Sequence, residues 1–205
     1  QTMKKAAKFA LIKTIPIFLG YIFLGIAFGL LLQKSGLSVF WAFLISTLVY
    51  AGSMQFALVG ILTGGLSYVT TAVMTLFINS RHAFYGLTFI ERFKEMRKAY
   101  PYMVFSLTDE TYSLLCSMAR PSAFTDKEWK AATFFTAFFD QCYWIAGSVL
   151  GALMGELITF DTTGIDFAMT ALFVVICVDQ WKAAKTHIPA VTGFICGALF
   201  LVLIR

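Results

Sequence analysis

Long apolar blocks constrain the fold of this chain more than any other feature. Most of them reach the length of a membrane span, which needs about 20 apolar residues within a range of roughly 17–25. Because lipid offers no hydrogen-bond partners to backbone amides, such blocks are expected to be helices. The sequence therefore predicts an all-α, polytopic membrane protein with about seven transmembrane helices. The blocks are Ile15–Leu32, Val39–Leu62, Tyr68–Ile90, Met103–Met118, Ala131–Met154, Phe167–Val178 and Ile188–Ile204.

The balance of apolar and charged residues supports this class. Of the 205 residues, 59% are hydrophobic and 13% are charged, whereas a soluble domain has about 45–50% apolar and about 25% charged residues. The net charge of +5 indicates no nucleic-acid partner, because the cations cluster in loops, where membrane topology accounts for them. The first block is too long for the apolar region of a signal peptide, so its basic flank is expected in the cytoplasm. That flank holds Lys4, Lys5, Lys8 and Lys13.

The four cysteines lie in apolar blocks and form no CxxC motif or metal-ligand spacing with a histidine. They are expected to pack as small hydrophobic residues, and no metal or cofactor is predicted. These residues are Cys116, Cys142, Cys177 and Cys196.

An Ala-Gly-Ser segment occurs at Ala51–Ser53 and again at Ala146–Ser148, 95 positions apart. At this offset, 12 of 37 aligned pairs are identical between Val39–Thr75 and Phe134–Thr170. Three blocks in each half would turn the second half upside down, as in many secondary transporters, whose site lies at the repeat interface. We expect one transmembrane domain over 1–205, with repeats over about 10–90 and about 101–182 and an extra helix over 188–205.

The repeated Ala-Gly-Ser has two interpretations. It can mark matching helix interruptions, which are the best sequence pointer to a transporter site. It can also mark tight helix packing, because small residues let helices approach closely. The sequence is compatible with both.

The course of the two central blocks is also open. Val39–Leu62 and Ala131–Met154 are expected to run through the membrane, because each is long enough to cross. The alternative is that both are re-entrant. The cations do not decide, because each arrangement leaves one basic group on the outer side. That group is Arg92, Lys94, Arg97 and Lys98 in the first case, and Arg120, Lys127 and Lys130 in the second.

Polar residues inside apolar blocks are the candidate functional groups, because charges at membrane depth are costly and usually face protein or water. Asn79, Arg81 and His82 lie inside Tyr68–Ile90. Arg81 can anchor a substrate carboxylate or an internal acid, or it can snorkel to the interface. His82 can carry protons or act only as a packing group.

The acidic residues suggest proton coupling. Asp109 and Glu110 stand in the middle of Met103–Met118, where a low dielectric favours proton uptake and release; neutralisation by Arg81 is the structural alternative. Asp140, followed by Gln141, lies at moderate depth. Asp179 ends a twelve-residue block that is too short to cross unaided.

Four motifs resemble the AzlC family, the large subunits of bacterial branched-chain amino-acid exporters. The resemblance covers nearly the whole chain and implies a multi-pass inner-membrane permease that works with a small hydrophobic AzlD-type subunit. It implies proton-driven export of valine, leucine or isoleucine, and in some members methionine. The family usually continues beyond the position of Arg205, so the number of spans stays open. The motifs are YAGSMQFALVG (Tyr50–Gly60), NSRHAFYGL (Asn79–Leu87), SLTDETYSL (Ser106–Leu114) and VDQWKA (Val178–Ala183).

An amino-acid site needs donors for a carboxylate, acceptors for an ammonium group and an apolar pocket. Broken helices can supply the first two through free amides and carbonyls. We expect Gly52 to loosen its helix and Gly147 to mirror it. The substrate-binding residues are predicted to be Gly52, Ser53, Gln55, Phe56, Asn79, Arg81, Gln141, Gly147 and Ser148, and the proton-coupling residues Asp109, Glu110, His82, Asp140 and Asp179.

Two other function classes are weighed. An intramembrane enzyme is not expected, since Gly52-Ser53 does not form the GxSxG motif of hydrolases. The alternative function is a non-transporting scaffold subunit of a membrane complex. A scaffold would have no need for an arginine and several acids at mid-depth.

Overall fold

The computed structural model describes residues 2–157 and 186–203, and between them only positions 167, 171, 174, 177, 178, 181, 182 and 184. The chain divides into two units, Gln1–Ile165 and Asp166–Arg205. The described residues form helices joined by short turns, without a strand, which confirms the predicted all-α class. Among them, one helix, α1 (Thr2–Lys34), is both long and apolar enough to cross a membrane by length and composition. The second unit contains the apolar helix α9 (Ile188–Leu203).

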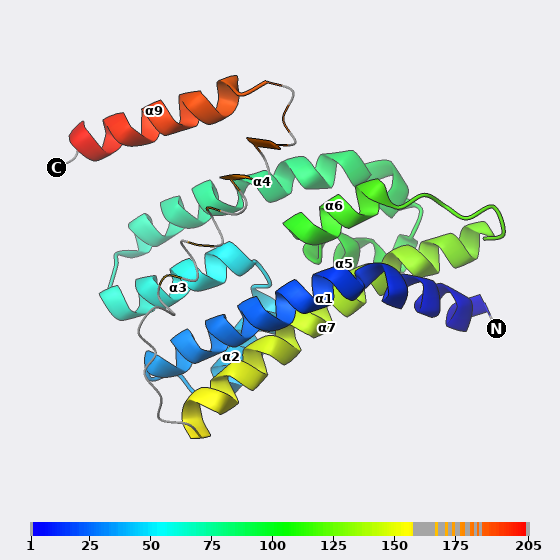
Figure 1. Cartoon of the computed structure of the whole chain (residues 1–205), viewed down its shortest axis with the longest axis horizontal. Coiled ribbons are helices and arrows are strands. Elements are labelled where there is room, and N and C mark those ends of the chain that lie inside the picture. The colour runs from blue at the N-terminus through cyan, green and yellow to red at the C-terminus, as the bar shows by residue number, and fades with distance from the viewer. Residues whose placement is uncertain are drawn as a thin grey trace. The chain divides into compact units, whose positions relative to one another are not determined.

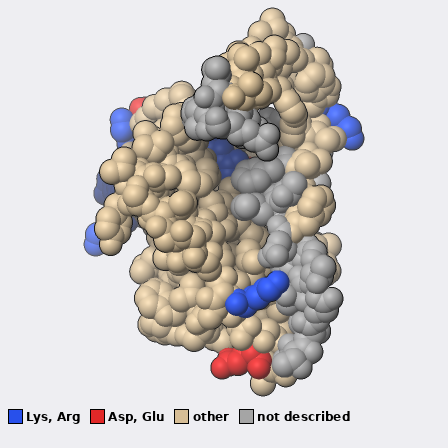
Figure 2. Space-filling view, turned by 90° about the vertical axis from the view of Figure 1, so that its left-hand side faces the viewer, with Lys and Arg blue, Asp and Glu red and all other residues tan. Residues whose placement is uncertain are grey.

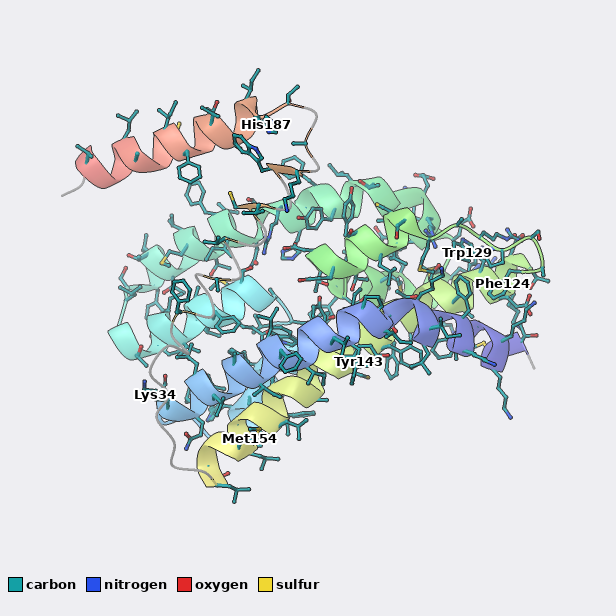
Figure 3. The ribbon with its side chains drawn as sticks, viewed as in Figure 1. Lys34, Phe124, Trp129, Tyr143, Met154 and His187 are labelled. Atoms are coloured by element: carbon teal, nitrogen blue, oxygen red, sulfur yellow. The ribbon has the colours of Figure 1, made fainter. Side chains whose placement is uncertain are left out.

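The first unit is built on a parallel pair of long helices, α1 and α7 (Asp126–Leu157), which lie side by side along most of their length (Figure 1). Lys5 contacts Glu128 near the start of both helices, and Gly25 faces Ser148 further along. Figure 3 shows the same direction: Phe124 and Trp129 lie near the start of α1, whereas Lys34 and Met154 lie at the opposite end.

Glycines allow the close approach of these two helices. A Cβ added to Gly147 would lie 2.9 Å from the carbonyl oxygens of Tyr21 and Ile22. One added to Gly151 would overlap the carbonyl oxygen of Ile26, and one added to Gly29 the carbonyl oxygen of Ser148. Small residues therefore bring the two backbones into contact, as they do in many membrane helix pairs.

A first helical hairpin consists of α2 (Val39–Leu48) and α3 (Gly52–Gly64). The bend lies at residues 49–51, where Tyr50 has a φ of 37°, a left-handed conformation that ends a helix. Side chains meet across the bend, because Gln55 Nε2 donates to Ser46 Oγ at 3.2 Å. The hairpin begins just after the C-terminal end of α1, reaches the middle of α7 and turns back (Figure 1).

The long helix α4 (Tyr68–Lys94) follows and runs antiparallel to α7. Its Arg81 contacts Ser53 at the start of α3, and its Arg92 contacts Thr133 near the start of α7. Ser67 caps α4 by accepting a hydrogen bond from the Thr70 amide at 3.2 Å.

A second hairpin follows the short 3₁₀ helix η1 (Arg97–Ala99) and consists of α5 (Tyr100–Phe105) and α6 (Asp109–Ser117). It begins at the end of the molecule where α4 finishes and α7 starts, reaches the middle of α7 and returns. The two hairpins therefore enter the bundle from opposite ends.

Three helix predictions need correction. Val39–Leu62 is not one helix, because it bends back at Tyr50, and Met103–Met118 is not one helix, because it bends at residues 106–108. Ala131–Met154 is continuous within α7, so the predicted break at Gly147 is wrong. The physical reason is that Gly147 serves the contact with α1, which was the packing alternative for the repeated Ala-Gly-Ser.

Candidate functional site

The bends of the two hairpins meet beside the middle of α7. The rings of Tyr50 in the first bend and Phe105 next to the second bend have centroids 6.3 Å apart. Each bend leaves the N-terminus of a helix at this level, that of α3 at Gly52 and that of α6 at Asp109. The first amides of a helix lack intrahelical partners and carry a partial positive charge.

Arg81 joins the two helix starts. Its Nη2 donates to Ser53 Oγ at 2.7 Å, and its Nη1 lies 2.7 Å from Asp109 Oδ2. The expected proximity of Arg81 to an internal acid is therefore found. His82 Nε2 lies 4.0 Å from the other oxygen of Asp109.

Glu110 and Asp140 are connected by three hydroxyl groups. The Tyr21 hydroxyl lies 2.7 Å from Glu110 Oε2 and 2.6 Å from Thr108 Oγ1. Thr108 Oγ1 lies 3.2 Å from Thr111 Oγ1, and Thr111 Oγ1 lies 2.7 Å from Asp140 Oδ2. This chain links α1, the second bend, α6 and α7.

Gln55 is fully buried and both ends of its amide are used. Trp144 Nε1 donates to Gln55 Oε1 at 2.7 Å, and Gln55 Nε2 donates to Ser46. The adjacent Phe56 packs its ring on Phe28, with centroids 5.7 Å apart. These residues therefore hold α3 against α1 and α7.

Gln141 also uses both ends of its amide. Tyr102 OH donates to Gln141 Oε1 at 2.8 Å, and Gln141 Nε2 donates to the Thr47 carbonyl at 3.3 Å. It thereby connects both hairpins to α7. Ser148 Oγ donates to the Trp144 carbonyl within α7, so Gly147 and Ser148 lie in the helix contact and are separate from the bends.

Several buried polar atoms around the bends have no hydrogen-bond partner among the described residues. Buried polar groups are normally paired, so each exception needs an explanation such as a ligand. The tightly enclosed members are Tyr50, Ser106 and Asp140, with exposed fractions of 3%, 0% and 0%. The atoms are Tyr50 OH, Asn79 Oδ1, Arg81 Nε, Ser106 Oγ, Asp109 Oδ1 and Asp140 Oδ1.

The structure thus gathers most of the predicted site residues and adds others. Gly52, Ser53, Asn79, Arg81, His82, Asp109, Glu110 and Asp140 lie at the bends or on the helices beside them, while Asp179 lies outside the described residues. Tyr21, Tyr50, Thr108, Thr111 and Trp144 were missed. Thr108 alone had a local signal, since a threonine directly before two acidic residues is typical of a helix start.

Equivalent contacts recur in the two hairpins. Ser53, at the start of α3, pairs with Arg81 on the next long helix, and Thr111, at the start of α6, pairs with Asp140 on its next long helix. The sequence separations are 28 and 29 residues.

Comparison with known proteins identifies relatives over nearly the whole chain. Residues 16–158 match the family model described as AzlC protein. The Branched-chain amino acid transport protein AzlC of Bacillus subtilis (strain 168) is 37% identical over 93% of this chain and 74% of that protein. An uncharacterized membrane protein of Helicobacter pylori (strain ATCC 700392 / 26695) is 35% identical over 97% of this chain and 86% of its own length.

A more distant relative is the Inner membrane protein YgaZ of Escherichia coli (strain K12), which is 26% identical over 91% of this chain and 77% of that protein. No solved structure matches. The family match covers well over half of the chain and the residues that form both hairpins, α4 and α7. On these grounds the chain belongs to the AzlC family, a family of membrane proteins with a branched-chain amino acid transport protein among its members.

Proposed function

We propose that this protein is a multi-pass inner-membrane secondary transporter that exports branched-chain amino acids, and also methionine, in exchange for protons. The Bacillus subtilis relative, a branched-chain amino acid transport protein, supports the substrate class. The observation that carries the proposal is the set of buried, unpartnered polar atoms where the two bends meet. Such atoms are expected where a polar ligand completes their hydrogen bonds.

Each part of an amino acid has a suitable partner at the bends. The starts of α3 and α6 offer free amides to a carboxylate, with Ser53, Asn79 and Arg81 beside them. Asp140 Oδ1, Ser106 Oγ and Tyr50 OH can accept from an ammonium group. Phe105, whose ring centroid lies 6.3 Å from that of Tyr50, supplies apolar surface next to these groups, and Phe56 is proposed to extend it. One methylene is worth only about 1–3 kcal/mol in an apolar pocket, so several similar side chains would be accepted.

In this proposal the remaining predicted substrate residues do not contact the substrate. They hold the helices that surround the site in position. Gln55 and Gln141 already have protein partners at both ends of their amides. Gly147 and Ser148 position α7 against α1. Gly52 allows Trp144 to approach the start of α3, because an added Cβ would lie 3.3 Å from the indole ring.

Proton coupling is assigned to Asp109, Glu110, His82 and Asp140, which stand around the same point. The three acids differ in their surroundings. Asp109 is paired with Arg81, whereas the side chains of Glu110 and Asp140 make hydrogen bonds only to hydroxyl groups within the described part of the chain. In this proposal Glu110 and Asp140 carry the exchanged proton, and Asp109 and His82 set the charge beside them.

We further propose that the inverted repeat consists of α2–α3–α4 and α5–α6–α7, in place of the repeat at an offset of 95. Each unit is a hairpin followed by a long helix, the hairpins enter from opposite ends, and the contacts at separations of 28 and 29 residues are equivalent. Both hairpins are re-entrant in this arrangement.

This topology gathers most of the basic residues of the first unit at one end. Glu95, after α4, pairs with Lys130 on α7 at 2.9 Å, and Lys5, on α1, pairs with Glu128 at 3.4 Å. The N-terminal lysines, the α4–α5 turn and the α6–α7 loop therefore share one end of the bundle. By the positive-inside rule this end is cytoplasmic. Side chains on the face drawn in Figure 2 are mostly uncharged.

The AzlD-type small subunit is proposed as the partner, and the lipid bilayer as the surroundings. Large apolar side chains on α4 are exposed, including Val69 at 74%, Phe77 at 76% and Phe84 at 69%. Such a surface is suited to lipid or to a second hydrophobic subunit.

The test is leucine efflux from proteoliposomes that contain this chain with and without the small subunit. Efflux should rise when a pH gradient is imposed, and Tyr50→Phe should reduce it, because this variant removes an unpartnered hydroxyl from the site. Tyr68→Phe is the matched control, since Tyr68 is 96% exposed. Wild-type efflux no faster than from empty vesicles, or an unaffected Tyr50→Phe variant, would overturn the proposal.

A further inference from the structure

We infer that Tyr21, Thr108 and Thr111 form a proton relay through which Glu110 protonates Asp140, and that this protonation releases the ammonium group of the substrate. The inference rests on the proposed function and deepens it. It assigns a role to three residues that lie outside the predicted site, and it gives the two acids different tasks.

The relay is continuous in space. Its four oxygen–oxygen contacts measure 2.7, 2.6, 3.2 and 2.7 Å from Glu110 through Tyr21, Thr108 and Thr111 to Asp140. All four lie within or close to the hydrogen-bond range for hydroxyl groups. A hydroxyl group both donates and accepts, so each of the three can pass a proton on.

Counting protons shows how many the relay holds. Four contacts need four protons, and the three hydroxyl groups supply three. One further proton, on either carboxyl group, completes every hydrogen bond. With both acids ionised one contact lacks a proton, and with both protonated two protons face each other in one contact. Glu110 and Asp140 therefore share one proton.

The shared proton can change ends without moving any oxygen. With the proton on Glu110, the donors run from Glu110 to Tyr21, Thr108, Thr111 and Asp140. When each O–H bond in this row breaks and each acceptor forms a new one, Glu110 becomes a carboxylate and Asp140 becomes protonated. No hydroxyl group gains or loses a net proton, so the transfer is balanced.

The two ends differ in access. Asp140, Thr111 and Tyr21 are 0%, 0% and 4% exposed, whereas Glu110 is only half-buried. Asp140 therefore exchanges protons through the relay, and Glu110 is the end that can meet water.

Asp140 connects the relay to the substrate because its second oxygen has no hydrogen-bond partner in the described part of the structure. That oxygen is one of the proposed acceptors for the ammonium group, and a carboxylate binds a cation more strongly than a neutral acid does. A proton arriving from Glu110 therefore removes the charge that holds the substrate.

Other titratable and charged groups surround the relay. They lie on the first bend, on α4, on α5 and on α6, and any of them can influence the proton balance. They are Tyr50, Arg81, His82, Tyr85, Tyr102 and Asp109. Asp109 and Arg81 neutralise each other at 2.7 Å, which leaves Glu110 and Asp140 as the acids joined through hydroxyl groups.

The experiment compares leucine–leucine exchange with export driven by a pH gradient in proteoliposomes containing this chain and its small subunit. Exchange needs substrate binding and conformational change but no net proton movement. Thr111→Val should keep exchange near the wild-type rate and reduce proton-driven export by about 100-fold, the low end of what a positioned proton-transfer group contributes. Thr111→Ser, which keeps the hydroxyl group, should restore export.

Thr136→Val is the matched control, because Thr136 is also fully buried but its hydroxyl donates to the Ala132 carbonyl within α7. Proton-driven export by Thr111→Val at the wild-type rate would overturn the relay. Equal loss of exchange and export would also overturn it, because that pattern indicates a structural or binding role. A wild-type protein without leucine exchange would instead refute the proposed function.

Discussion

Trp144 donates a hydrogen bond from Nε1 to Gln55 Oε1 at 2.7 Å, and this contact joins the middle of α7 to the first turn of α3. The two residues are 89 positions apart in the chain. Gln55 in turn donates to Ser46 on α2. One buried amide therefore holds both arms of the first hairpin against α7.

Replacing Gln55 by alanine should destabilise the protein. The change leaves the Trp144 N–H group buried without a partner, which costs about 1–3 kcal/mol. Thermal unfolding in detergent measures the effect, and Gln33→Ala on α1 serves as the control because Gln33 is only partly buried. Equal unfolding temperatures for the two variants would contradict this role of Gln55.

Gly151→Ala should separate α1 from α7. The added methyl group would overlap the Ile26 carbonyl, and overpacking of this kind costs about 1–3 kcal/mol. Gly20→Ala is the matched control, since nothing lies within 4 Å of a Cβ added there. The free energy of unfolding of both variants decides the question: a Gly151 variant as stable as the Gly20 variant would show that the helices do not meet at this position.

Arg81→Ala should weaken leucine binding by about tenfold or more, because a hydrogen bond to a charged group is worth about 1.5–3 kcal/mol. The variant would also release Ser53 and Asp109, which Arg81 contacts at the starts of the two helices. A scintillation-proximity assay or calorimetry measures affinity, with Lys98→Ala on η1 as the control. Unchanged affinity would exclude Arg81 from the site.

Glu128, near the start of α7, should make the stability of the protein depend on pH. Its carboxylate accepts from the Thr125 amide at 2.8 Å, and this bond, together with Lys5, lowers the pKa of Glu128. A lowered pKa in the folded state contributes stability above the ordinary pKa of about 4.3, and this stability is lost as the pH falls through the folded-state pKa. Glu128→Gln should therefore lose less stability on acidification than the wild type, in unfolding curves recorded from neutral to acidic pH. An identical pH dependence would be evidence against this linkage.

The positions of the turns test the re-entrant topology. In a cysteine-free background, Leu66→Cys between α3 and α4 should react with an impermeant thiol reagent in intact cells, because Leu66 is 44% exposed and lies on the proposed outer side. Lys98→Cys should react only after permeabilisation. If the segment from α2 to α3 instead ran through the membrane, the two positions would show the opposite pattern.

The general nature of the site could be predicted from local sequence. Arg81 and Asp109 stand out because charges inside apolar blocks need partners, and the structure pairs them. Tyr21 could not be found in this way. It lies in an apolar run, where nothing local shows that its hydroxyl group faces Glu110 on a segment 89 positions away.

The sequence by itself determined that the chain is helical and apolar, because long apolar blocks can satisfy their backbone only in helices. The tertiary structure alone decided which blocks bend. Residues 49–51 and 106–108 leave their helices because Trp144, Gln141 and Asp140 on α7 bind polar groups beside each bend. Gly147 remains helical because it packs against the backbone of α1. A helix break in an apolar block depends on partners from distant segments, and those partners are set by packing rather than by the residues at the break.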